Sequence, residues 1–226
     1  MRRLRRKSLR RPRRKKSPPR RRKPSPNPLR TTLPPRPVAV AITGGIGAGK
    51  SEALKAFARR GAAVASSDEI VHRLLAEDEE VRREVVERFG PQVLDGSGAI
   101  DRTALGRIVF ADRERLDALE ALLHPRVVRE YLAWREELGR RPDPPRVAVV
   151  EVPLLYETGG ERRFDKVVVI TAPPEVRAAR TEVADAREER LLPDEEKVRR
   201  ADFAYVNDGS LDGLDRFVGE VLERLP

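Results

Sequence analysis

Short apolar runs alternate with amphipathic stretches along most of the chain. The runs are rich in valine, alanine and isoleucine without polar alternation, which is typical of strands buried on both faces of a parallel sheet. They lie at residues 38–43, 62–65, 146–152, 166–171 and 203–206. The pattern predicts an α/β fold, in which a doubly wound, parallel five-stranded sheet carries helices on both faces.

The amphipathic stretches predict the helices. We expect them at residues 52–60, 69–75, 79–89, 101–110, 113–123, 126–138, 174–190, 194–201 and 211–225. A break between two of them is expected at His124-Pro125, because proline removes a backbone N–H donor. The mostly helical segment of about 69–140 is interpreted as an insertion between strands that covers a substrate.

A glycine-rich loop joins the first strand to the first helix. Residues 44–51 fit G-x-x-x-x-G-K-[ST] without a mismatch, and a strand–loop–helix context is what this motif requires. Glycine lets the backbone N–H groups wrap a triphosphate closely, and the helix N-terminus favours anions. The loop predicts a P-loop NTPase fold of the nucleotide-kinase type. The nucleotide-binding candidates are Gly45, Ile46, Gly47, Ala48, Gly49, Lys50, Ser51 and Glu52.

Two side chains of this loop carry expected chemistry. Lys50 is predicted to reach the β- and γ-phosphates and to be catalytic, and the Ser51 hydroxyl is predicted to ligate Mg²⁺. The cofactor expected is therefore Mg²⁺ with ATP as co-substrate. The alternative is a glycine-rich turn that binds nothing.

Asp68 is the candidate for catalytic acid/base work and for contact with the acceptor. It follows the second strand, which we expect to lie beside the first, and a transferred phosphoryl group needs a carboxylate to take the proton of the attacking hydroxyl. The alternative is that Asp68 caps the following helix. Both roles are compatible with each other.

Other polar residues leave alternatives open. Glu151 and Glu157 flank the turn after the third strand, where either could organise Mg²⁺ or be an ordinary loop carboxylate. His124 is a ligand or a structural junction, and His72 is given no role. Arg180 is favoured as a phosphate clamp, whereas Arg177 is interpreted as part of a solvated, salt-bridged face.

The charge divides the chain into two parts. Residues 1–37 hold 17 Lys and Arg, nine Pro and no acidic residue, which leaves residues 38–226 with 30 basic and 37 acidic residues and a net charge of −7. The first part is predicted to be disordered. It is interpreted as a basic arm for nucleic acid or an anionic surface, as a targeting peptide, or as a mis-assigned translation start. The acidic second part gives no reason to expect nucleic-acid binding.

The 226 residues contain no cysteine. Disulfides and thiolate metal sites are therefore excluded, which fits a cytoplasmic protein. No run of about 18 apolar residues is present, so no membrane partner is expected. We expect a monomer.

Residues 38–226 resemble the dephospho-coenzyme A kinase family. The family's T-G-G-I-G-[SA]-G-K-S is matched from Thr43, and its I-D-R-x-x-L-x-x-x-V-F from Ile100. Of its D-A-D-x-I-x-R segment, the stretch from Ser66 to Arg73 keeps the second aspartate, Asp68, whereas Ser66 replaces the first. Its L-x-H-P is matched from Leu122 and its P-L-L-[FY]-E from Pro153. Its E-E-K and N-x-G-S segments are matched from Glu195 and from Asn207. The combination in this order is specific, although the loop alone is shared by many families.

The resemblance implies a reaction: ATP phosphorylates the ribose 3′-hydroxyl of dephospho-coenzyme A, giving coenzyme A and ADP in the last step of coenzyme A synthesis. Asp68 matches the family's base near the acceptor hydroxyl. Arg102 and His124 lie in the matched segments and are taken as substrate-binding candidates, and Arg180 as an ATP-binding one.

The chain departs from the family pattern at the lid. Residues of about 180–193 are several positions short, the usual glycine is missing, and Arg190 stands where a glutamine is usual. A lid excludes water and supplies an arginine. Two alternatives therefore stay open: a nucleotide-binding protein of this fold with reduced or lost turnover, and another P-loop small-molecule kinase.

Overall fold

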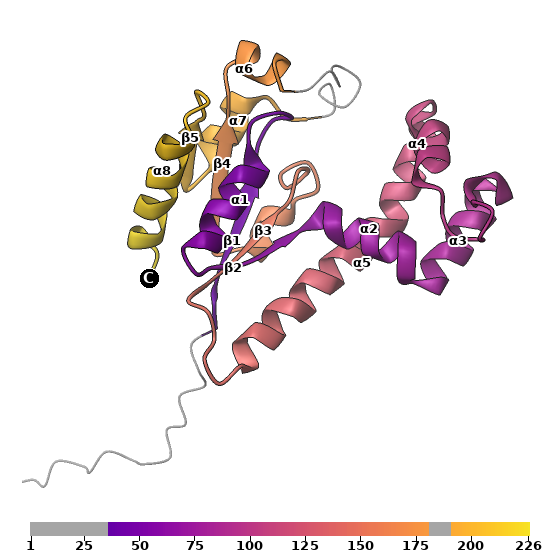
Figure 1. The fold of residues 1–226 in the computed structure, drawn as a ribbon, viewed down its shortest axis with the longest axis horizontal. Coiled ribbons are helices and arrows are strands. Elements are labelled where there is room, and N and C mark those ends of the chain that lie inside the picture. The colour runs from indigo at the N-terminus through magenta and orange to yellow at the C-terminus, as the bar shows by residue number, and fades with distance from the viewer. Residues whose placement is uncertain (1–35, 181–190) are drawn as a thin grey trace, which may run out of the picture. The chain divides into compact units, whose positions relative to one another are not determined.

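Five parallel strands form one sheet (Figure 1). The computed structural model describes residues 36–180 and 191–226. Residues 1–35 of the predicted disordered extension and most of the expected lid therefore lie outside the described residues. The strands are β1 (Val38–Thr43), β2 (Ala63–Ser66), β3 (Val147–Glu151), β4 (Lys166–Thr171) and β5 (Phe203–Val206). Their order in the sheet is β2-β3-β1-β4-β5, which confirms the predicted fold class.

The expected adjacency of β1 and β2 is wrong. β3 lies between them and pairs with both, with Ala148 opposite Ala39 on one side and opposite Ala63 on the other. Chain order does not fix strand order, because a right-handed crossover can skip a place that a later strand fills. Because these strands are parallel, the carboxyl ends of β1, β2 and β3 still lie together at one edge of the sheet.

The helices are α1 (Lys50–Arg59), α2 (Ser67–Glu77), α3 (Glu79–Phe89), α4 (Arg102–Phe110), α5 (Arg113–Arg140), α6 (Pro174–Ala178), α7 (Asp194–Arg200) and α8 (Leu211–Arg224). Two short 3₁₀ helices lie at Pro91–Val93 and Gly160–Arg163. Of the predicted helix at 174–190, the described part forms α6, which ends at Ala178 with Ala179 as its C-terminal cap. The rest of the prediction, residues 181–190, lies outside the described residues. No helix in the described ranges combines the length and the apolar character needed to cross a membrane.

The sheet is covered on both faces. On one face, Phe57 of α1 and Val218 of α8 are fully buried against Val40 and Val168 of the strands. On the other face, Leu155 and the turn after β3 pack on residues of β1 and β4, with Leu192 beside them. β1, β3 and β4 therefore have no solvent-exposed face, as their lack of polar alternation predicts. The expectation is wrong for β5, where Ala204 and Val206 are exposed at the edge of the sheet.

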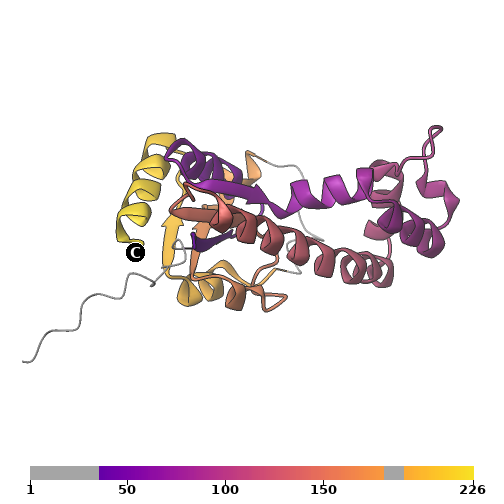
Figure 2. The same ribbon diagram turned by 90° about the horizontal axis from the view of Figure 1, so that it is seen from below.

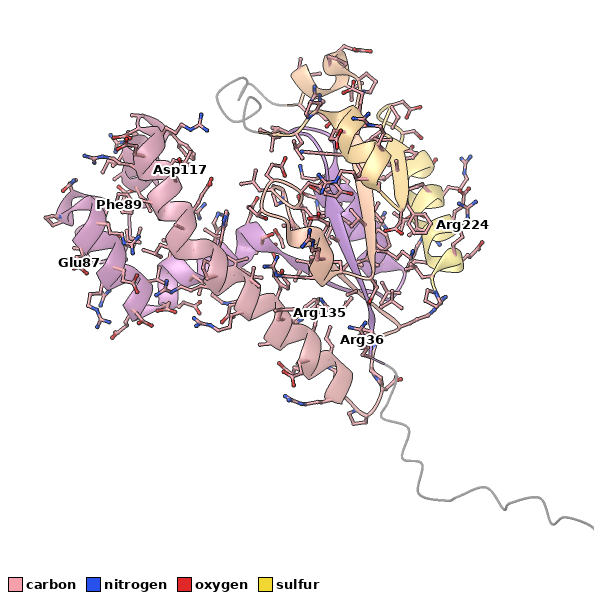
Figure 3. The ribbon with its side chains drawn as sticks, turned by 180° about the vertical axis from the view of Figure 1, so that it is seen from behind. Arg36, Glu87, Phe89, Asp117, Arg135 and Arg224 are labelled. Atoms are coloured by element: carbon pink, nitrogen blue, oxygen red, sulfur yellow. The ribbon has the colours of Figure 1, made fainter. Side chains whose placement is uncertain are left out.

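Helices α2 to α5 form the insertion between β2 and β3. In Figure 2, α5 runs beside α2 toward α3 and α4. Their shared core includes Ile70, Val85, Leu105 and Leu122, and it also includes Phe89 at the end of α3 (Figure 3).

The expected break at Pro125 is wrong, because α5 continues through it as one helix of 28 residues. A proline removes one N–H from a helix. Here both halves of α5 are held in the same core, by Leu122 and Leu123 before the proline and Val127 after it. The guanidinium of Arg126 also donates to the carbonyl of Leu122 (2.9 Å). Tertiary packing therefore outweighs the local cost.

Candidate active site

The phosphate-binding loop has the conformation that its glycines allow. Gly49 is the residue before α1 and has φ +95°, a left-handed value that favours glycine. A Cβ atom at Gly49 would lie 2.3 Å from Nδ2 of Asn207. The first N–H groups of α1 therefore open directly onto the loop, where they are free to bind an anion.

Asn207 fastens the loop to the end of β5. Its Nδ2 donates to the carbonyl of Ala48 (2.9 Å), and its Oδ1 accepts from the N–H of Gly209 (3.0 Å). Its side chain is buried, since the residue is 3 % exposed. The sequence offered this residue only as part of the N-x-G-S segment, and gave no sign that it would contact the loop 159 positions earlier.

Lys50 lies inside the loop. Its Nζ donates to the carbonyl of Gly45 (2.9 Å). Burial lowers the pKa of this ammonium, and the nearby charge of Lys197 lowers it further, whereas the carboxylate of Glu151 opposes the shift. A bound phosphate would favour the charged form, because opposite charges at short range stabilise each other.

Ser51 and Glu151 come together at the end of β3. The Ser51 hydroxyl donates to Oε2 of Glu151 (3.3 Å). Burial raises the pKa of the Glu151 carboxyl, and the charge of Lys50 opposes that shift. A hydroxyl and a carboxylate are oxygen ligands of the kind that Mg²⁺ prefers. No cluster of three or more potential metal-binding His, Cys, Asp or Glu side chains occurs among the described residues.

Glu157 has a different environment from Glu151. Its Oε1 accepts from the N–H of Leu192 (2.9 Å) and lies 3.1 Å from Nζ of Lys197. Both contacts are made by Oε1, whereas Oε2 is buried and has no hydrogen-bond partner among the described residues. Of the two glutamates that flank the turn after β3, Glu151 is the one that contacts Ser51 of the phosphate-binding loop, which suits a metal site there.

Asp68 lies where three cavities meet. A cavity of about 450 Å³ is lined by Asp68 together with Lys50, Ser51 and Glu151, and we call it the phosphate cavity. Asp68 is the second residue of α2 and is exposed. It is not the cap of this helix, because α2 begins two residues earlier than expected and Ser66 occupies the capping position.

The other two cavities reach into the insertion. One, of about 540 Å³, is lined by Asp68, His124, Tyr131 and Leu154 among others, and we call it the apolar cavity. The other, of about 420 Å³, is lined by Asp68, Arg102 and Phe110 among others, and we call it the basic cavity. The structure thus places Arg102 and His124 in different cavities, each of which includes Asp68.

Two residues of the basic cavity were missed by the sequence analysis. His72, which had no expected role, accepts a hydrogen bond at Nε2 from the guanidinium of Arg102. Phe110 is 52 % exposed and lines both the basic and the phosphate cavity. A helical position one turn after Asp68 is the signal that could have indicated His72.

Two arginines contact the phosphate-binding loop. Arg180 donates from Nη1 to the carbonyl of Gly47 (3.2 Å). Arg177 was interpreted as part of a solvated, salt-bridged face. The ion pair is present, with Nη1 4.0 Å from Oδ2 of Asp194. The solvated part is wrong, because the side chain is only 23 % exposed and its Nη1 lies 2.7 Å from where a Cβ of Gly45 would be. The side chain of Glu52 pairs with Lys55 on the surface of α1 (2.8 Å), so only its backbone faces the loop.

Comparison with known proteins identifies the family of the chain. Residues 38–213 match the sequence model of the dephospho-CoA kinase family. The chain belongs to the dephospho-CoA kinase family. A dephospho-CoA kinase of Symbiobacterium thermophilum is 43 % identical over 182 residues, which cover 76 % of this chain and 75 % of the relative. A dephospho-CoA kinase of Thermus thermophilus is 39 % identical over 197 residues, covering 84 % and 92 %.

Solved structures also resemble this dephospho-CoA kinase family member. The crystal structure of TT1252 from Thermus thermophilus is 38 % identical with a TM-score of 0.68, covering 85 % of this chain and all of the other. A dephospho-CoA kinase from Campylobacter jejuni is 26 % identical with a TM-score of 0.60, covering 84 % and 98 %. The family resemblance inferred from the sequence motifs is confirmed.

Proposed function

We propose that the chain transfers the γ-phosphate of ATP to the ribose 3′-hydroxyl of dephospho-coenzyme A, which yields coenzyme A and ADP. One observation of the site is the main support for this proposed reaction. Asp68 is shared by the phosphate cavity and by both cavities of the insertion. An acceptor bound in the insertion would therefore present its hydroxyl to the carboxylate and to the phosphate at the same place.

The phosphates of ATP would lie in the phosphate-binding loop. The N–H groups at the start of α1 and the ammonium of Lys50 would hold the β- and γ-phosphates. Ser51 and Glu151 would hold Mg²⁺, directly or through water, and their 3.3 Å hydrogen bond fits such a site. The ion would neutralise charge on the phosphate oxygens.

Asp68 would orient the acceptor hydroxyl and accept its proton. The acceptor oxygen would form the new bond to the γ-phosphorus as the bond to the β-phosphate oxygen breaks. An exposed carboxylate can then pass the proton to water. Its place in the first turn of α2 keeps the side chain at the edge of the sheet.

The remaining parts of dephospho-coenzyme A would divide between the two cavities of the insertion. Its diphosphate carries negative charge, which favours the basic cavity with Arg102 and His72. Its adenine base is flat and apolar on both faces, which favours the apolar cavity with His124 and Tyr131. Both arms would leave the ribose beside Asp68.

Arg180 would act on the nucleotide side. Its contact with the Gly47 carbonyl places its guanidinium at the loop, where a forked donor suits phosphate oxygens. The segment that follows it, residues 181–190, lies outside the described residues, so the proposed short lid rests on the sequence alone. The proposal includes a monomer acting in the cytoplasm.

The test is ADP release by the full chain with Mg²⁺–ATP, measured with and without dephospho-coenzyme A. We expect release that depends on the acceptor, with one coenzyme A formed for each ADP. Adenosine is a control acceptor that has the base but lacks the diphosphate. Shikimate is a control acceptor that lacks both. Acceptor-independent release, or equal rates with all acceptors, would contradict the proposal.

A further inference from the structure

A buried ion pair joins α7 to the turn after β3. Nζ of Lys197 lies 3.1 Å from Oε1 of Glu157, and their side chains are 0 % and 13 % exposed. A buried lysine is rare unless it is paired, because burial disfavours its charged form. Two well-packed apolar side chains would commonly stabilise a fold as much or more. Stability alone therefore does not explain this pair.

Glu157 also holds the segment that leads into α7. The N–H of Leu192 donates to the same carboxylate oxygen (2.9 Å). The preceding residue, Leu191, lines the phosphate cavity. Because Leu191 and Leu192 are consecutive, the carboxylate limits how far this wall of the phosphate cavity can move.

The turn that carries Glu157 also forms a wall of the apolar cavity. Leu154 lines both the phosphate and the apolar cavity. The Thr158 hydroxyl donates to the Leu154 carbonyl (2.8 Å), and the Gly160 N–H donates to the Leu155 carbonyl (2.7 Å). Glu157 is thus fixed to the backbone that shapes the acceptor side.

The charge of Lys197 acts on the phosphate side as well. It is one of the causes that lower the pKa of Lys50, so the two ammonium groups repel each other. In the part of the chain that the structure describes, Glu157 is the ion-pair partner of Lys197. A triphosphate in the loop would attract both ammonium groups and so offset the repulsion between them.

We propose that Glu157 and Lys197 are positioning residues for phosphoryl transfer. Their ion pair holds Leu191, a wall of the phosphate cavity, in place relative to Leu154, a wall shared by the phosphate and apolar cavities. The γ-phosphate and the acceptor hydroxyl are thereby kept in reactive geometry. Small displacements of reacting groups cost rate steeply, even when they arise away from the reacting atoms.

The test separates positioning from stability. Lys197→Met leaves Glu157 buried without its partner, and we expect a lower melting temperature and a lower kcat. The double variant E157M/K197M replaces the pair by two apolar side chains, and we expect it to regain most of the melting temperature. Its kcat should remain about tenfold or more below that of the unchanged chain. A double variant with kcat and both KM values unchanged would overturn the proposal.

Glu157→Gln provides a second measurement if the double variant does not fold. Its amide oxygen keeps an acceptor for the Leu192 N–H but loses the charge, so kcat should fall while ATP still binds in a direct titration. Normal kcat in Glu157→Gln would also overturn the proposal. The matched control is Glu161→Gln. It breaks a nearby ion pair that also joins α7 to the segment after β3, between Arg200 and Glu161 (2.7 Å). We expect it to leave kcat unchanged.

Discussion

At the scale of single residues, the site depends on carboxylates with different surroundings. Asp68 is exposed at the junction of the cavities, Glu151 is buried beside Ser51, and Glu157 is partly buried beside the fully buried Lys197. A proton acceptor, a metal ligand and an ion-pair partner need these different environments. Each carboxylate can therefore be tested by its own substitution.

Asp68→Asn should lower kcat by about 10²-fold or more, because the amide cannot accept the proton of the attacking hydroxyl. ATP affinity, measured by direct titration, should change little. The matched control is Glu69→Gln, a neighbour that is also exposed in the first turn of α2. A decrease of only a few-fold in kcat for Asp68→Asn would leave Asp68 without a role as the base.

Glu151→Gln should raise the melting temperature of the nucleotide-free chain at pH 7 and strongly lower Mg²⁺-dependent transfer. Burial raises the pKa of Glu151 in the fold. The folded state thus holds this proton more tightly than the unfolded state, and the carboxylate costs stability as pH rises through the raised value. The melting-temperature difference between the two chains should therefore shrink as pH falls below the ordinary glutamate range. A difference that grows at low pH would contradict the assignment.

At the scale of elements, strand identity was predictable and strand order was not. The runs at 166–171 and 203–206 are strands with the expected bounds, because valine-rich runs leave little choice of structure. The position of β3 between β1 and β2, and the continuity of α5 through Pro125, depend on packing between distant segments. The same holds for the contact of Asn207 with Ala48 and for the pairing of His72 with Arg102.

Asn207→Ala should weaken the connection between β5 and the phosphate-binding loop. The Ala48 carbonyl would lose its donor in a buried place, which costs about 1–3 kcal/mol. We expect a lower melting temperature and a higher KM for ATP, with little change in KM for dephospho-coenzyme A. An equal change in both KM values would indicate a general loss of folding instead.

Pro125→Ala should stabilise α5, by about 2 kcal/mol, because it restores an N–H to the interior of the helix. Pro125 also lines the apolar cavity. KM for dephospho-coenzyme A is therefore the second measurement, and we expect it to rise if the proline shapes that wall. A lower melting temperature would show that the helix needs the proline where it is.

At the scale of the whole molecule, catalysis should require only the acidic second part of the chain. The family match begins at residue 38, and all residues of the proposed site lie beyond it. Arg36, the first described residue, is labelled in Figure 3. It pairs with Asp165 beside the start of β4 (2.7 Å). Removal of residues 1–35 keeps this pair and should leave kcat and both KM values unchanged.

The measurement is steady-state kinetics of both chains over a range of salt concentrations. A basic segment that binds the anionic substrates would make KM of the full chain rise with salt more steeply than KM of the shortened chain. Parallel salt dependences are the expected result. Divergent ones would assign the extension a part in substrate capture.

The exposure of Asp68 also bears on how the product leaves. In the proposed reaction, the new dianionic phosphate on the acceptor oxygen would lie next to the Asp68 carboxyl that has just taken the proton. Water can reach Asp68 and remove this proton, after which two like charges face each other at short range. The same side chain that draws the hydroxyl in would then repel the phosphorylated product, so proton loss to solvent would favour release and oppose rebinding of coenzyme A.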